Sequence, residues 1–474
     1  MKYKGFYIIA FLFLLTSCDN FLEYKDKDKV IPNKLAHYEE LIFGEIIVKH
    51  WEDVFVNLPL MTDDVACYVK DQVETYDSDS REKYYGWYTW AVEPQHDFNG
   101  EDRQDKAWAF FYHKILMCNI VESEVNKLED DLDGLKKRLL GEVQCIRAIS
   151  YFYLVNLYGA PYESKEQAVT AMGIPINRET GIYEKYYTRS TLAEVYDEME
   201  KDLLKARQNF QEGAVKNTIF RPNIHVANLF LSRIYLFQKR YEEAITYATE
   251  VITHSEASIQ SMGNMINNKN FYNKGNTGII FSWGTGEQGP IYSSNWDAGR
   301  FIVSTDLKSK YIPEDKRSTS FFDSYSGYST KTTGDEIYRR AYRIEEAYLN
   351  RAEAYIELEK EWKKGIDDIH AIRQNRIEGD AWQTKAATLA DAREAYRLER
   401  RLEFCFEDFR WFDMRRWGLG AEHRYENFRN NQSYQLFRLE PNSPNYILPI
   451  PLDEQDINTH IEKPERVDCK VNEL

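Results

Sequence analysis

Aromatic side chains that lie outside any helical repeat are the residues whose chemistry can be named first. They fall in two stretches of the sequence, residues 84–90 and residues 283–296. Flat rings of this kind stack on the C–H faces of sugars, while amide, carboxylate and guanidinium groups nearby bond the hydroxyls. The predicted ligand-binding residues are Trp87, Trp90, Trp283, Tyr292, Asn295 and Trp296, with Asn99, Asp102, Asp297 and Arg300 as further polar neighbours. The alternative, for about half of the rings, is that they pack under the loops.

Catalytic signatures do not occur in the sequence. It contains no H-E-x-x-H, G-x-S-x-G or G-x-x-x-x-G-K-S/T string, and its 9 histidines lack metal-ligand spacing. Residues 284–289 fit G-x-G-x-x-G, but Pro290 follows where a dinucleotide site needs the start of a helix. We therefore expect no catalysis, no cofactor and no metal site. Glycoside hydrolysis needs only two carboxylates, which keeps a surface glycoside hydrolase open as the alternative.

The first residues predict export and lipid attachment. Lys2 and Lys4 precede an apolar run over residues 6–15 that is too short to span a bilayer, and Leu-Thr-Ser-Cys follows. We interpret residues 1–17 as a lipoprotein signal peptide, Cys18 as an acylated anchor (palmitate or a similar chain), and residues 18–32 as a lipidated tether rich in Lys and Asp. An aspartate after the lipidated cysteine, here Asp19, signals inner-membrane retention in some bacteria. This motif alone therefore does not decide which membrane holds the protein.

The composition excludes one class of partner. The 474 residues carry a formal charge of -16, which argues against binding nucleic acid and favours a neutral or cationic small partner, or only solubility. Besides Cys18 there are five cysteines, and an odd number argues against a complete disulfide framework. We expect Cys118, Cys145 and Cys405 to be buried in helices.

Helical hairpins are the elements that must position the aromatic stretches. Apolar residues recur at three- and four-residue spacing over residues 139–157, 192–206, 227–235, 241–252, 344–355 and 362–372. Small residues (Ser232, Ala244, Ala352 and Gly365) stand where paired helices would approach closely. This pattern resembles the tetratricopeptide repeat and predicts a partial solenoid, although any one hairpin could be an unrelated helix pair.

Two irregular inserts interrupt the helices, at about residues 52–104 and 255–335. Helices are expected on either side of the first insert, over residues 35–51 and 105–128, and a short strand is expected in the second, over residues 278–283. The predicted fold class is therefore mainly α: one domain over residues 33–474, with helical hairpins that support a loop-rich ligand-binding face.

The most distinctive string is LERRLEFCFEDFRWFDMRRWG, residues 398–418. We expect Leu398, Leu402, Phe406 and Phe409 on one helix face, and pairing of Glu399, Arg400 and Glu403 with Arg410, Asp413 and Arg416. The string resembles the signature E-R-x-x-E-x-x-x-E-x-x-R-x-x-D-x-x-R-W of the SusD/RagB family of Bacteroidetes lipoproteins. Residues 18–23 (CDNFLE), 142–148 (EVQCIRA) with Tyr158-Gly159, and 446–451 (YILPIP) with Asp456-Ile457-Asn458 are similar to other parts of that family.

The resemblance implies a nutrient-binding lipoprotein of the outer membrane, anchored through its lipid and exposed at the cell surface. It also implies a partner, a SusC-like TonB-dependent transporter, and a glycan or oligosaccharide ligand held by aromatic residues of the inserts without catalysis. Residues 400–417 would then have a structural role. Some members of the family bind peptides or other nutrients, and a repeat scaffold that binds only protein is a further alternative.

Overall fold

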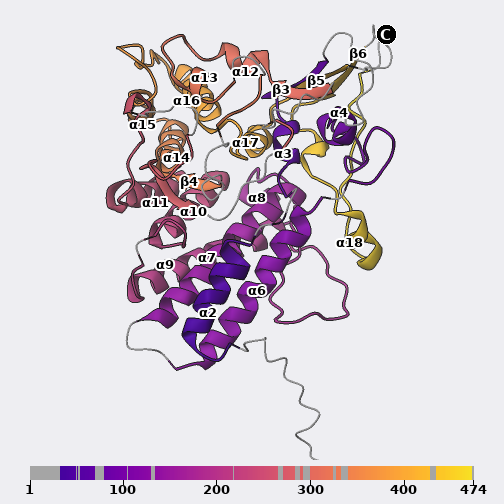
Figure 1. The fold of residues 1–474 in the computed structure, drawn as a ribbon, viewed down its shortest axis with the longest axis vertical. Coiled ribbons are helices and arrows are strands. Elements are labelled where there is room, and N and C mark those ends of the chain that lie inside the picture. Colours follow the sequence, from indigo (N-terminus) through magenta and orange to yellow (C-terminus); the bar gives the residue numbers. More distant parts are fainter. Residues whose placement is uncertain are drawn as a thin grey trace, which may run out of the picture.

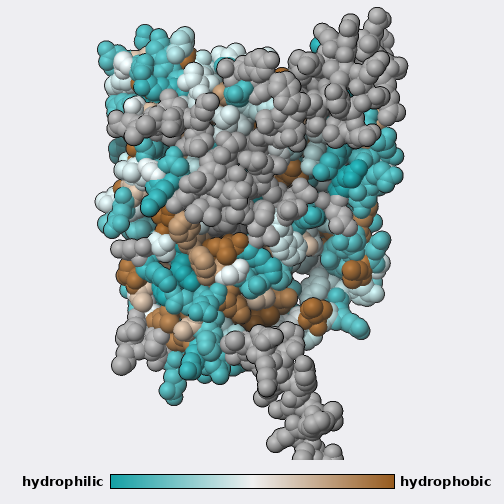
Figure 2. Space-filling model, in the orientation of Figure 1, coloured by the Kyte–Doolittle hydropathy of each residue, from teal (hydrophilic) through white to brown (hydrophobic). Residues whose placement is uncertain are grey.

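The computed structural model describes residues 32–49, 51, 54–69, 80–103, 105–129, 134–216, 218–264, 271–282, 289–291, 299–323, 327–331, 340–426 and 434–471. The predicted signal peptide, Cys18, Trp283, Tyr292, Asn295 and Trp296 lie outside these residues. In the described part of the chain, no helix is both long enough and apolar enough to cross a membrane. Hydrophilic side chains cover much of the described surface in Figure 2, and the hydrophobic ones gather mainly over the lower helices.

A layer of long helices forms the lower part of the molecule (Figure 1). It contains α2 (Leu35–Leu41), continued by the π-helical turn η2 (Ile42–Ile47), with α6 (Ala107–Lys127), α7 (Leu135–Tyr158) and α9 (Leu192–Glu212). The α7 helix packs between α6 and α9, is buried along most of its length, and ends at Gly159 as its apolar period predicted. Thr191 and Glu194 begin α9 with a capping box, in which each side chain bonds the backbone N–H of the other residue.

Both predicted hairpins are present and pack against each other. The first consists of α10 (Ile224–Phe237) and α11 (Tyr241–His254), and the second of α14 (Ile344–Glu357) and α15 (Trp362–Arg373). The break at residues 238–240 falls where the sequence indicated it. The small residues Ser232, Ala244 and Ala352 are fully buried. At Gly365 an added Cβ would lie 2.5 Å from the carbonyl oxygen of Ala352, which explains why the second hairpin needs glycine there.

Replacing Gly365 by alanine tests this close approach. We expect Gly365→Ala to lower the free energy of unfolding by about 1–3 kcal/mol, because the new methyl group meets backbone that cannot move aside. The matched control is Gly44→Ala in η2, where nothing lies within 4 Å of the added Cβ. Urea unfolding followed by circular dichroism measures both. Equal midpoints for the two variants would contradict the close packing of α14 on α15.

The two inserts carry short elements in place of wholly irregular loops. The first contains α3 (Asn57–Leu60), β1 (Val65–Val69), α4 (Ser80–Lys83) and α5 (Tyr85–Tyr88). The second contains β2 (Ile279–Ser282), β3 (Gly299–Val303), α12 (Thr305–Ser309) and α13 (Arg317–Ser320). The predicted strand at residues 278–283 is confirmed by β2, which pairs antiparallel with β4 (Ala341–Arg343). The second insert also contains the 3-10 turn η3 (Met262–Asn264), and α8 (Lys165–Ala168) is a short connection outside the inserts.

The signature string of residues 398–418 forms two helices, α16 (Leu389–Phe404) and α17 (Arg410–Arg416). The expected single helix face through Leu398, Phe406 and Phe409 is therefore wrong. Phe406 and Asp408 have φ angles of 61° and 63°, a left-handed conformation that cannot continue a helix, and Leu398 is 38% exposed. The hairpin of β5 (Ala421–Glu426) and β6 (Tyr434–Leu439), the turn η5 (Pro444–Tyr446) and α18 (Leu452–Ile457) follow.

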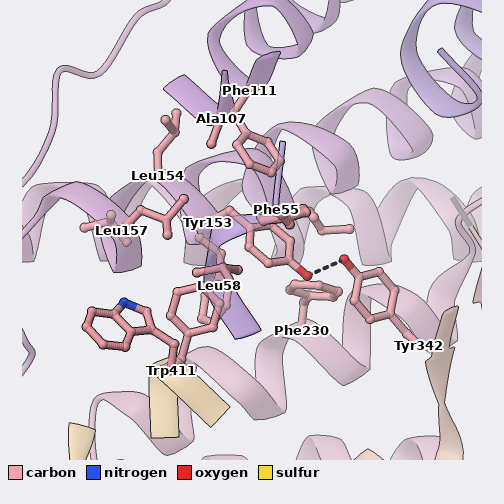
Figure 3. Close-up of a cluster of buried hydrophobic side chains, with 14 of the residues drawn as sticks. Phe55, Leu58, Ala107, Phe111, Tyr153, Leu154, Leu157, Phe230, Tyr342 and Trp411 are labelled. Atoms are coloured by element: carbon pink, nitrogen blue, oxygen red, sulfur yellow. Dashed lines mark hydrogen bonds between the residues drawn. The ribbon is translucent and has the colours of Figure 1, made fainter. Parts of the chain in front are cut away.

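A continuous apolar core joins the first insert to the helices, and Figure 3 shows its centre. Phe55 of the insert packs on Phe111 of α6 and Tyr153 of α7, with ring centroids 5.5 and 5.0 Å away. The hydroxyls of Tyr153 and Tyr342 are hydrogen-bonded at 3.0 Å, which ties α7 to β4. Cys118 and Cys145 are buried in this core, as expected, and burial raises the pKa of the Cys118 thiol to about 12, so it stays protonated at neutral pH.

A buried charge network joins the second insert to α16. Glu403 is fully buried and accepts hydrogen bonds from three guanidiniums: Arg376 at 2.8 and 2.9 Å, Arg343 at 2.9 Å and Arg317 at 3.1 Å. Of the pairings expected within the string, Arg400 with Asp413 is confirmed at 2.8 Å, and Arg416 also bonds Asp413. Glu399, Glu403 and Glu407 pair with arginines outside the string, so the string connects distant parts of the chain.

Candidate functional site

The two inserts meet through an antiparallel pair of strands. In the register of β1 and β3, Val65 lies opposite Val303 and Val69 lies opposite Gly299. The chain therefore leaves β1 next to the point where it enters β3. Tyr292, Asn295 and Trp296 stand shortly before Gly299 in the sequence, so the segment that contains them joins the fold at this end of the strand pair.

A cavity of about 640 Å³ opens at the other end of this strand pair, between the start of β1, the start of α12 and the β5–β6 hairpin. A volume of this order is typical of small-molecule sites and can hold sugar residues. Its lining mixes polar and apolar residues and comes from distant parts of the chain. The lining residues that carry charged or aromatic groups are Asp63, Tyr88, Asp306, Glu422, His423, Arg424, Arg438 and Glu440.

Trp87 and Trp90 are both buried, and Trp90 packs on His423, a residue of the cavity wall. Their side chains are 2% and 1% exposed, and the Trp90 indole Nε1 donates to the carbonyl oxygen of Met61 at 2.9 Å. Neither ring has a face open to solvent, so their predicted role as stacking platforms does not fit this structure and the packing alternative does. Both rings are large and apolar, and burial removes more surface from water for them than for most residues.

His423 of β5 fixes the hairpin against the first insert. Its ring lies between the rings of Tyr88 and Trp90, with both centroids 4.1 Å away. Nδ1 lies 2.6 Å from the carbonyl oxygen of Tyr88, and Nε2 lies 2.9 Å from that of Thr62. Burial lowers the pKa of His423 to about 4, although both carbonyls act in the opposite direction. The histidine therefore holds one wall of the cavity in place.

Most of the charges around the cavity are already paired. Arg410 donates to both carboxylate oxygens of Asp63, at 2.7 and 2.6 Å. Burial alone would raise the pKa of Asp63, but Arg410 brings it below its usual value and keeps the carboxylate charged. Arg401 donates to Asp64 at 2.7 Å and to Asp306 at 2.9 Å. The two arginines that line the cavity, Arg424 and Arg438, both lie on the hairpin.

The hairpin presents its own row of charges to the cavity. Arg438 of β6 lies opposite Glu422 of β5 and donates to it at 2.8 Å from Nε. The Arg424 guanidinium lies over the ring of Tyr434, 3.5 Å from its centroid. Glu440 makes no ion pair with any residue that the structure describes. Sequence reasoning missed these residues, since they match no motif and their shared face becomes visible only once the strand register is known.

Comparisons with known proteins cover most of the chain. A family model described as "Starch-binding associating with outer membrane" matches residues 21–236, and the SusD family model matches residues 239–464. The SusD-like protein P25 of Formosa agariphila is 21% identical, over 74% of this chain and 77% of its own length.

Solved structures with a similar fold support the same assignment. A SusD superfamily protein from Bacteroides thetaiotaomicron superposes with a TM-score of 0.70 at 20% identity, covering 91% of this chain and 98% of its own. A putative sugar binding protein from Bacteroides vulgatus gives a TM-score of 0.71 at 22% identity, with 91% and 97% covered. The paired hairpins, the signature string and these matches agree, and the chain belongs to the SusD/RagB family.

Proposed function

We propose that this protein binds a glycan at the outer surface of the outer membrane and passes it to a SusC-like TonB-dependent transporter without catalysing a reaction. The observation that carries the proposal is the pairing of β1 with β3, which brings residues 63–67 of the first insert and 304–306 of the second to one cavity. The family description names starch binding and the outer membrane, and one structural relative is a putative sugar binding protein.

The ligand contacts in this proposal are Trp283, Tyr292, Asn295 and Trp296. Trp283 directly follows β2, and the other three precede β3, so all four belong to segments that join the strands of the second insert. Trp87 and Trp90 are buried, and Trp90 supports the cavity wall through its contact with His423. Single stacking contacts are weak, so the affinity for a glycan comes from several contacts along its length.

The proposed anchor is an acyl chain on Cys18. Figure 1 shows α2, the first described helix, toward one end of the molecule and the strands β3 and β5 toward the other. The tether from Cys18 to Pro32 can extend to about 50 Å, because each residue spans at most about 3.6 Å. That reach lets the cavity turn toward a transporter while the lipid stays in the membrane.

Titration of the full mature chain against a panel of glycans tests the proposal. We expect binding of at least one glycan, and a loss of affinity of about fivefold in Trp296→Ala, because one ring stack contributes roughly 1 kcal/mol. The control is Trp382→Ala, which removes a half-buried indole packed on His370, away from the cavity. No binding to any glycan, or equal losses in both variants, would reject the site.

The alternative of a surface glycoside hydrolase predicts a different readout. A hydrolase releases reducing ends from the glycan that it binds, whereas a binding protein leaves the glycan intact. Incubation of the purified protein with the glycan selected by titration, followed by a reducing-sugar assay, separates the two functions.

A further inference from the structure

A second cavity lies among the helices, and its described lining shares no residue with that of the cavity beside β1. It opens between the turn that joins α10 to α11, the neighbouring helices α14 and α16, and the end of α17 (Figure 1). Its volume is about 240 Å³, below the roughly 300–1,000 Å³ of sites for drug-sized ligands. Five aromatic side chains contribute to the lining: Tyr162, Phe237, Tyr241, Tyr396 and Trp417. The cavity therefore suits a small ligand with an apolar or ring-shaped body.

The two carboxylates of this lining already have partners. Glu353 is 3% exposed and accepts hydrogen bonds from both terminal nitrogens of Arg416, at 2.7 Å from Nη2. Glu357 accepts from the Tyr396 hydroxyl at 2.9 Å and from Nε of Arg393 at 3.3 Å. A cationic ligand would therefore have to compete with guanidiniums that these carboxylates already bind.

Two cations of the lining are not paired in this way. Lys239, in the turn, donates to the carbonyl oxygen of Glu163 at 2.7 Å. Nε of Arg397 donates to the Tyr396 hydroxyl at 3.4 Å, and the guanidinium lies 5.2 Å from the ring centroid of Trp417. Neither cation forms an ion pair with a carboxylate of the residues that the structure describes. Both therefore keep N–H donors and a positive charge that a ligand can use.

Tyr241 adds a third donor. Its hydroxyl makes no hydrogen bond to any residue in the described part of the chain. Burial raises the pKa of Tyr241, and the nearby carboxylates of Glu353 and Glu357 raise it further, so the hydroxyl keeps its proton and can donate. These three groups, one O–H and two cations, are all hydrogen-bond donors.

We propose that this cavity binds a small organic carboxylate, an anion whose body is apolar or a single ring. A carboxylate has only acceptor atoms, and its charge complements those of Lys239 and Arg397. Charge-assisted hydrogen bonds of this kind are about twice as strong as neutral ones, and the neutral analogue of the same ligand lacks them. The proposal does not depend on glycan binding, because the described linings of the two cavities have no residue in common.

Isothermal titration of the full mature chain with matched ligands tests the proposal. The pairs are benzoate with benzamide and glucuronate with glucose, in which each second compound lacks the charge. We expect at least one carboxylate to bind, with its neutral match at least about tenfold weaker and with an affinity that falls as the salt concentration rises. No binding of either carboxylate, or neutral matches that bind equally well, would overturn the proposal.

Three substitutions locate the binding. Arg397→Gln and Lys239→Gln each remove one cation, and Tyr241→Phe removes only the hydroxyl. Each is expected to weaken carboxylate binding by about fivefold or more. Lys274→Gln is the matched control, since Lys274 is exposed and lines neither cavity, and its replacement should change the affinity by less than about twofold. Equal affinities of Lys274→Gln and all three cavity variants would overturn the proposal, whether or not a glycan binds at the other cavity.

Discussion

Replacement of Glu403 by glutamine is expected to lower the free energy of unfolding by about 3–5 kcal/mol, because it leaves buried guanidiniums without their carboxylate. Glu403 is fully buried and contacts Arg317, Arg343 and Arg376 at once. These arginines come from α13, the start of α14 and the turn after α15, so the loss affects the attachment of the second insert to the helices. Urea unfolding followed by circular dichroism measures the difference.

The destabilisation caused by Glu403→Gln is expected to become smaller as the pH falls into the acidic range. Burial alone would raise the pKa of Glu403, but Arg376 and Arg343 hold it well below 4.5. A carboxylate with a lowered pKa stabilises the folded state fully above its unfolded pKa, and this stability is lost as the pH falls toward the folded value. The difference in the free energy of unfolding between wild type and variant should therefore be constant near pH 7 and should shrink below about pH 4.5.

Glu394→Gln is the matched control for this prediction. Glu394 lies on the same helix, α16, and its side chain is exposed. Its replacement should change the free energy of unfolding by less than about 0.5 kcal/mol, as is usual for surface positions. Equal unfolding midpoints for Glu403→Gln and Glu394→Gln would show that the buried network contributes little.

Trp90→Ala is expected to destabilise the protein by about 3–5 kcal/mol, the range for truncating a buried tryptophan. The change removes the ring that covers His423 and the hydrogen bond to Met61, and the backbone carbonyl of Trp90 also accepts from Asn445. The hairpin that forms one cavity wall would lose its packing against the first insert. Thermal and urea unfolding measure the loss, with the half-buried Trp382→Ala as control.

The same variant decides between a core and a ligand-binding role for Trp90. If the ring belongs to the core, its removal lowers the stability of the protein, and any change in glycan binding follows from that loss. If Trp90→Ala kept the wild-type unfolding midpoint and lost glycan binding, the indole would be a ligand contact and its burial in this structure would not represent the binding state.

Helices with a single apolar face were predictable from the sequence because their spacing is a local property. The apolar period of residues 139–157 indicated α7, and the break at residues 238–240 indicated the turn between α10 and α11. The same reasoning failed at Phe406 and Asp408, where the apolar period continues but the backbone turns left-handed. Hydrophobic spacing carries no information about a left-handed φ at a residue other than glycine.

The candidate site was only partly predictable, for a related reason. Aromatic composition indicated that the inserts form the ligand-binding region. It could not distinguish a buried ring from one at the surface, and Trp87 and Trp90 are buried. His423 contacts Tyr88 and Thr62, residues more than 330 positions away in the sequence. Such contacts depend on the tertiary fold, and no local motif records them.

Hydrogen exchange of the full mature chain, with and without the glycan selected by titration, tests the central claim most directly. Exchange slows where a ligand stabilises the backbone against local opening. We expect slower exchange in residues 63–67, 304–306, 420–424 and 438–441, which lie around the cavity, and in residues 283–303, which contain the proposed ligand contacts, with little change in the hairpins of α10–α11 and α14–α15. Protection confined to those hairpins, with none around the cavity, would contradict it.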